Sequence, residues 1–238
     1  MNYNFIRIEQ EEFVCTLTLA RAEKRNAFTP MMISEIAHVV NEVNRDETIK
    51  LLVIRADGPV FCSGMDLKTF YDPSLDVRHS AIPLHDISLG EVMSSLRKPS
   101  VAVVEGDVIA GGFLLILGCT YVLAEEKVRF RLPELGLGIF PFQVMESLLK
   151  VMPEKHVLQL CLDTEYFGVD KAMHLRIVDR YYTPASLTQL IRSFENIQTD
   201  VLVEGLSALH DIREIPQGER FKFLKERLEA LRNRKQQG

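Results

Sequence analysis

The chain has 238 residues, of which 47% are hydrophobic and 26% charged, an ordinary balance for one globular domain with a sizeable core. Its net charge of −5 offers no broad basic surface, which argues against nucleic acid as a partner. The longest apolar stretch, residues 108–119, is too short to cross a bilayer and contains glycines. We therefore expect a soluble, cytoplasmic protein without a membrane partner.

The four cysteines lie far apart in apolar runs, at Cys15, Cys62, Cys119 and Cys161. This pattern favours buried thiols in a reducing compartment over disulfides or a metal site. No metal-binding residue is predicted.

Two strands and a helix are expected near the start of the chain. Residues 5–8 and 13–19 alternate as the strands of a hairpin do, and residues 21–26 form a charged turn after them. Thr29 suits the N-cap of a helix, with Pro30 at its first position and apolar residues following at helical spacing. Residues 51–55 then predict a buried strand.

Two strand-to-turn segments follow. Residues 101–104 predict a short buried strand, Gly106 and Asp107 a tight turn, and Gly111 opens an apolar helix over residues 113–117. Unpaired amides at such a helix start suit a negative oxygen. The segment 60–67 (VFCSGMDL) follows strand 51–55 in the same way, so the two segments together are able to form an oxyanion hole. The alternative is that the glycines only let the helix pack closely on a sheet.

Residues 68–91 are the least regular segment, and a loop of this length is often functional. It contains His79, His85 and Asp86, which are candidate pocket residues, although histidines without metal-ligand spacing are more often structural. A short helix is expected over residues 91–96.

One carboxylate stands in an apolar turn later in the chain. Residues 120–124 and 128–131 predict strands, and the turn 133–142 (PELGLGIFPF) then contains Glu134. Burial there would raise the pKa of Glu134 and make it a better base near neutrality. The alternative is a capping or surface glutamate.

The rest of the chain predicts helices over residues 142–151, 155–162, 169–175, 187–194, 201–209 and 221–231, with a strand at 178–182. No linker divides the sequence. We predict a core over residues 1–185 and a helical C-terminal region, residues 186–238, of the same domain.

Three of these segments carry a family resemblance. Residues 21–27 (RAEKRNA), 60–67 and 105–112 (EGDVIAGG) resemble, in order and spacing, the signature segments of the crotonase (enoyl-CoA hydratase/isomerase) superfamily. Residues 165–181 are similar to its late helix-turn-strand. The resemblance implies an α/β fold of the crotonase (ClpP/crotonase) type, a spiral of ββα repeats with a helical C-terminal region. It also implies a homotrimer or homohexamer.

The resemblance assigns roles to particular residues. The backbone amides of Met65 and Gly111 would hold a thioester oxygen, and Glu134 would act as the catalytic base. The substrate is an acyl thioester of coenzyme A or of acyl carrier protein, and no other cofactor is expected. The residues implied in binding it are Ala22, Lys24, Arg25, Ser63, Gly64, Asp66, Leu67, Leu114 and Phe140.

The sequence departs from the hydratase pattern at one position. Hydratases carry a first glutamate where this chain has Leu114, so Glu134 alone remains as an acid or base. This pattern is more similar to the monofunctional Δ3,Δ2-enoyl-CoA isomerases. The alternatives are a hydratase whose second acid is Asp86 or Glu91, an acyl-thioester decarboxylase or hydrolase, and a non-catalytic acyl-CoA-binding protein.

Overall fold

The structure is a computed structural model that describes residues 1–237, with side chains as far as Arg234. It contains two sheets, one of six strands in the order β1-β2-β3-β5-β7-β10 and one of four strands in the order β4-β6-β8-β9. Pairing is parallel except between β1 and β2 and between β8 and β9. The larger sheet consists of β1 (Ile6–Glu11), β2 (Val14–Leu19), β3 (Leu51–Ala56), β5 (Ser100–Val104), β7 (Tyr121–Ala124) and β10 (Arg180–Tyr181). The smaller sheet consists of β4 (Val60–Cys62), β6 (Asp107–Ile109), β8 (Arg129–Arg131) and β9 (Phe167–Gly168).

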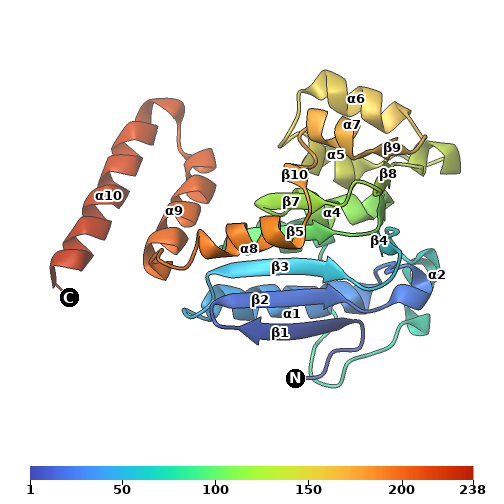
Figure 1. Cartoon of the computed structure of the whole chain (residues 1–238), viewed down its shortest axis with the longest axis horizontal. Helices are drawn as coiled ribbons and strands as arrows, with labels where there is room; N and C mark the ends of the chain where they lie inside the picture. Colours follow the sequence, from blue (N-terminus) through green and yellow to red (C-terminus); the bar gives the residue numbers. More distant parts are fainter. Residues whose placement is uncertain (238) are drawn as a thin grey trace.

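Helices connect and cover these strands, as Figure 1 shows. The α-helices are α1 (Pro30–Arg45), α2 (Leu67–Tyr71), α3 (Leu89–Ser94), α4 (Phe113–Leu117), α5 (Phe142–Leu148), α6 (Glu154–Leu162), α7 (Val169–His174), α8 (Pro184–Arg192), α9 (Thr199–Asp211) and α10 (Arg220–Gln237). Short 3-10 turns are η1 (Ala22–Lys24), η2 (Pro73–Leu75), η3 (Ala110–Gly112), η4 (Glu134–Leu137), η5 (Ile212–Glu214) and η6 (Gln217–Glu219).

A repeated path through both sheets builds the fold. The chain adds β3 to the larger sheet and β4 to the smaller one before it reaches α2 and α3, then β5 and β6 before α4, and then β7 and β8 before α5. Each repeat therefore places one strand in each sheet, and one or more helices follow the two strands. The predicted crotonase-type spiral of ββα repeats, with helices α8–α10 after it, is confirmed.

Both faces of the larger sheet are covered, which explains why its central strands are apolar throughout. In β3, Leu52 and Ile54 face the main core, whereas Leu51 and Val53 pack with Leu190 and residues near the end of α8. Helix α1 begins as predicted, since the Thr29 hydroxyl accepts a hydrogen bond from the Met32 amide at 3.1 Å. Figure 1 shows α9 and α10 packed on each other and standing apart from the sheets.

One expectation about local structure was wrong, since Asp107 begins β6 rather than completing a turn. Residues 68–91 are the least regular segment, as expected, although they include most of α2, the turn η2 and the start of α3. Strands of three residues such as β4 and β6 are too short to display an alternating pattern. In α2 the helix start comes from Asp66, whose carboxylate accepts a hydrogen bond from the Lys68 amide at 3.1 Å.

Candidate active site

Three turns that follow neighbouring strands bring the predicted catalytic residues to one edge of the smaller sheet. Met65 lies three residues after the end of β4, Gly111 two residues after β6 and Glu134 three residues after β8. These strands are adjacent and parallel, so their carboxyl ends meet at the same edge. The spiral repeat itself thus gathers residues that are far apart in the sequence.

The amide of Met65 is left unpaired by the strand pairing around it. The Phe28 amide donates to the Gly64 carbonyl and the Asp66 amide donates to the Phe28 carbonyl, both at 2.9 Å, so Met65 forms an isolated parallel bridge with Phe28. This pattern bypasses the Met65 N–H, which has no hydrogen-bond partner among residues 1–237. A free donor of this kind is what binding of an oxyanion requires.

The turn around Gly111 touches the turn around Gly64. A Cβ at position 64 would lie 3.1 Å from the Gly111 nitrogen and 2.8 Å from the Ala110 Cβ. A Cβ at position 111 would lie 2.7 Å from Cζ of Phe28. Gly64 also has a φ of +89°, and Ala110 holds a φ of +52°, which side chains rarely adopt. Both glycines are therefore needed for the two backbones to approach, and the amide of Gly111 lies in the first turn of η3, before the helical hydrogen bonds begin.

Glu134 is buried, with only 7% of its surface exposed, and its Oε2 atom has no hydrogen-bond partner within the part of the chain that the structure describes. Burial raises the pKa of Glu134, and a hydrogen bond from its own backbone N–H opposes this rise only in part. The turn that holds it closes through a hydrogen bond from the Ile139 amide to the Glu134 carbonyl at 3.1 Å. Glu134 is thus a buried carboxylate with a free oxygen, suited to accept a proton.

The other candidate acids and histidines do not share this environment. Glu91 closes a capping box with Ser88, whose amide donates to the Glu91 carboxylate at 2.9 Å, and this hydrogen bonding lowers the pKa of Glu91. Asp86 and His85 are exposed. His79 accepts hydrogen bonds at Nδ1 from the amides of residues 81 and 82 and fixes its own loop.

Leu114 is buried in α4, with 3% of its surface exposed. It follows Gly111 by three positions, so the two residues lie on the same face of the helix. An apolar side chain therefore stands next to the proposed oxyanion site, where it neither donates nor accepts a proton.

The two segments predicted to bind coenzyme A lie side by side. The Ser63 amide donates to the Arg25 carbonyl at 3.1 Å, and the Arg21 guanidinium pairs with the Asp66 carboxylate at 2.8 Å. Lys24 and Arg25 are exposed, as cations that meet a phosphate must be. Of the other residues predicted to bind substrate, Ala22 packs against Gly58, Leu67 is 50% exposed and Phe140 packs against Phe142. Their roles in binding stay predictions.

Asn26 holds this arrangement together and was not anticipated from the sequence. Its side chain is fully buried and donates to the carbonyls of Asp57 at 2.8 Å and Val60 at 2.9 Å, and it accepts from the Arg21 amide at 2.9 Å. A φ of +50° suits asparagine better than most residues. The only signal in the sequence was an asparagine that ends a charged turn.

Cys161 was also missed as a neighbour of Glu134. Burial raises the pKa of the Cys161 thiol, and the negative charge of Glu134 raises it further.

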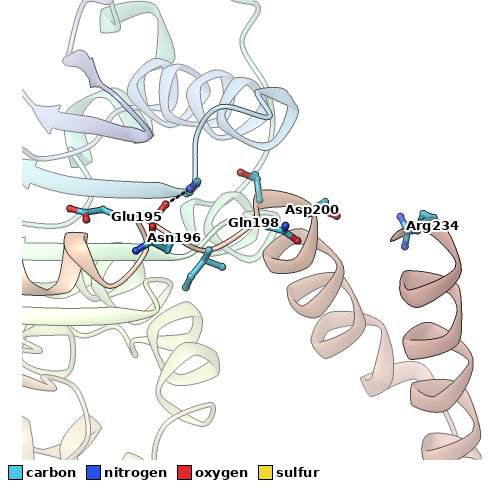
Figure 2. Close-up of a pocket in the computed structure, with 8 residues that line it drawn as sticks. Glu195, Asn196, Gln198, Asp200 and Arg234 are labelled. Atoms are coloured by element: carbon cyan, nitrogen blue, oxygen red, sulfur yellow. Dashed lines mark hydrogen bonds between the residues drawn. The ribbon is translucent and has the colours of Figure 1, made fainter. Parts of the chain in front are cut away.

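A different cavity, of about 730 Å³, lies between the start of β3 and helices α9 and α10 (Figure 2). Lys50 donates there to the carbonyl of Glu195 at 2.7 Å, and the other walls carry polar residues such as Asn196 and Asp200. This cavity borders the larger sheet, so it is separate from the edge that carries Met65, Gly111 and Glu134.

Over residues 1–237, we find neither a helix long and apolar enough to cross a membrane nor a cluster of three potential metal ligands.

Comparison with known proteins identifies the family of this chain. The model of the enoyl-CoA hydratase/isomerase family matches residues 9–205. A crotonyl-CoA hydratase from Syntrophomonas wolfei is 28% identical over 216 residues, which cover 88% of this chain and 80% of that protein. The mitochondrial enoyl-CoA hydratase domain-containing protein 3 of Mus musculus is 24% identical over 215 residues, or 87% of this chain and 70% of its own length.

Solved structures share the fold. An enoyl-CoA hydratase/isomerase from Marinobacter aquaeolei superposes with a TM-score of 0.84 at 22% identity, over 95% of this chain and 90% of that one. The human enoyl coenzyme A hydratase domain-containing protein 3 gives a TM-score of 0.83 at 20% identity, over 95% and 91% of the two chains. Since the family model spans most of the sequence, the chain belongs to the enoyl-CoA hydratase/isomerase family.

Proposed function

We propose that this protein moves the double bond of an enoyl-CoA from C3 to C2, with Glu134 as the single base. The observation that carries the proposal is a buried carboxylate with a free oxygen, together with an apolar Leu114 where a hydratase has its first glutamate. A hydratase needs groups that position a water molecule and handle its protons. An isomerase needs one group that removes a proton and returns it elsewhere.

The reaction balances without water. The Glu134 carboxylate takes a proton from C2, and the electron pair moves through the thioester to its oxygen. The amides of Met65 and Gly111 donate hydrogen bonds to the resulting dienolate oxygen. Glu134 then returns the same proton to C4, and the double bond lies between C2 and C3.

The raised pKa of Glu134 favours the first half of this cycle, the removal of the proton from C2. A carboxylate near its ordinary pKa of 4.5 is a weak base, whereas burial makes Glu134 hold a proton more tightly once it has taken it. The rate should therefore fall toward acid pH, where Glu134 is already protonated in the free enzyme.

Hydration of a 2-enoyl-CoA is the second candidate, favoured by the names of the relatives, many of which are hydratases. Decarboxylation, thioester hydrolysis and binding without turnover also use an oxyanion site, but no observation on this chain favours them. The capping role of Glu91 and the exposure of Asp86 argue against either as the second acid of a hydratase.

The test is turnover of a 3-enoyl-CoA by the wild type and by Glu134→Gln. Loss of the base should lower the rate by ~10²–10⁴, the usual share of general acid–base catalysis. Glu126→Gln, which changes an exposed glutamate after β7, is the matched control and should keep the wild-type rate. An unchanged rate in Glu134→Gln would show that another residue carries the proton.

A further inference from the structure

A cavity of about 330 Å³ lies next to α4, between α3, α5 and α9. Its walls combine polar and cationic residues with apolar ones, which include Met93, Leu117, Leu206 and Leu209. Leu209 lies at the rim of the cavity and is 63% exposed. A ligand with an aliphatic part would cover this surface.

The charges around the same cavity have one sign. Arg97, Lys150, His210 and Arg213 line it, and no aspartate or glutamate is among the described residues that do so. Arg97 donates to the Ser94 carbonyl at 3.1 Å and lies 3.4 Å from Nε2 of His210, whose Nδ1 lies 3.5 Å from the Asp211 carboxylate.

The positive charges of Lys150 and Arg213 have little compensation from nearby carboxylates. Lys150 is 3.9 Å from the nearest carboxylate oxygen, that of Glu146, a residue that is itself 71% exposed. Arg213 forms no ion pair with any of the side chains that the structure describes, which end at Arg234. An anion at this end of the cavity would therefore meet several donors, and the carboxylate beside His210, that of Asp211, is itself paired with Arg227 at 3.0 Å.

Leu114 lines the cavity and follows Gly111 by three positions, so it lies between the cavity and the candidate oxyanion site. A second groove, of about 400 Å³, shares Gly90, Ser94, Ser147 and Lys150 with it and extends to Phe142, just after the turn that holds Glu134. Gly90 lacks a side chain at this junction; a Cβ there would lie 3.5 Å from Cδ2 of Leu114. The two grooves form one path from Phe142 to the cations, and Glu91 and Glu146 line its wider part.

We propose that this path receives the distal part of the acyl chain and favours a chain that ends in a carboxylate. The inference rests on the proposed function, since it places the thioester at Met65 and Gly111. From Gly111 to Gly118, which lines the cavity, a helix rises by roughly 10 Å, at 1.5 Å per residue. A medium-length chain would span that distance, with its carboxylate beside Arg97 and Arg213.

Binding of saturated thioesters, which do not react, tests the inference apart from turnover. Calorimetric titrations would compare straight-chain acyl-CoAs of six to ten carbons with the matching ω-carboxyacyl-CoAs, at low and at high salt. We expect the wild type to bind at least one carboxylate-ended thioester about tenfold more tightly than its plain counterpart, and salt to reduce this preference. The double variant Arg97→Met, Arg213→Met should lose the preference yet bind the plain thioesters as before.

Arg192→Met, which removes an exposed arginine at the end of α8, is the control and should keep the preference. Equal affinities in the wild type at every chain length, or a preference that survives the double variant, would overturn the inference. The proposed function would stand in that case, because plain thioesters still bind. If neither type of thioester binds at millimolar concentration, the proposed function fails and the inference fails with it.

Discussion

Glu134 is expected to lower the stability of the protein while it enables catalysis. Its carboxylate is buried, and Oε2 has no hydrogen-bond partner in the described part of the chain. A polar group that loses its hydrogen bonds to water on folding, and gains none in return, lowers the stability of the folded state by about 1–3 kcal/mol. Glu134→Gln removes the charge and keeps the shape. We therefore expect this variant to be more stable than the wild type at pH 7, with each kcal/mol raising Tm by about 2–4 °C for a chain of this size.

The pH dependence of this gain follows from the direction of the pKa shift. Burial raises the pKa of Glu134 in the folded state, so folding favours the protonated form. Below the ordinary pKa of 4.5 both the folded and unfolded states are protonated, and the variant should have no advantage. As pH rises through the raised pKa of the folded state, the wild type loses stability relative to Glu134→Gln, and the gap reaches its full size.

Thermal unfolding of both proteins at equal concentration, across pH 4 to 8, measures this gap, and turnover is measured on the same samples. Glu126→Gln controls for the loss of one negative charge and should change neither quantity. The reasoning is refuted if Glu134→Gln is less stable than the wild type at pH 7, or if the gap does not depend on pH. Either result would mean that the carboxylate has a stabilising partner in solution.

Further predictions concern the backbone and the assembly. Gly111→Val should lower turnover by at least ~10², because even a Cβ at this position would lie 2.7 Å from the Phe28 ring and the amide would shift away from the thioester oxygen. The control is Gly168→Ala, since a Cβ at position 168 meets nothing within 4 Å. Full activity in a folded Gly111→Val variant would remove this amide from the mechanism. Asn26→Ala should lower the free energy of unfolding by about 2–4 kcal/mol, since it leaves the buried carbonyl of Val60 and the half-buried carbonyl of Asp57 without their donor. It should also raise KM for coenzyme A thioesters, and wild-type values of both quantities would contradict the role of Asn26. Light scattering should give three or six times the 27.2 kDa of one chain, and a stable monomer would contradict the expected assembly.

Much of the fold was predictable because the larger sheet carries strong local patterns. Residues 51–55 and 101–104 are apolar at every position save one, and the structure buries β3 and β5 from both sides. The start of α1 was readable from Thr29 and Pro30, whose effects are local. The short strands β4 and β6 were not readable, because their pairing depends on contacts between distant parts of the chain.

The candidate site was predictable only through the resemblance. An oxyanion hole made of amides leaves no side-chain pattern, so Met65 could be singled out only by its place in the segment 60–67. The structure adds the physical reason, which is a bridge to Phe28 that skips the Met65 amide. The role of Asn26 and the position of Cys161 near Glu134 depend on packing between segments that the sequence does not reveal.

The central claim is that one base acts alone, so the most direct measurement compares two reactions of the wild type. A 3-enoyl-CoA and the 2-enoyl-CoA of the same chain length would be supplied separately, and isomerisation and hydration followed under the same conditions. With Leu114 in place of a second acid or base, hydration lacks a contribution that is typically ~10²–10⁴. The account predicts that isomerisation exceeds hydration by at least ~10², and hydration that equals or exceeds isomerisation would contradict it.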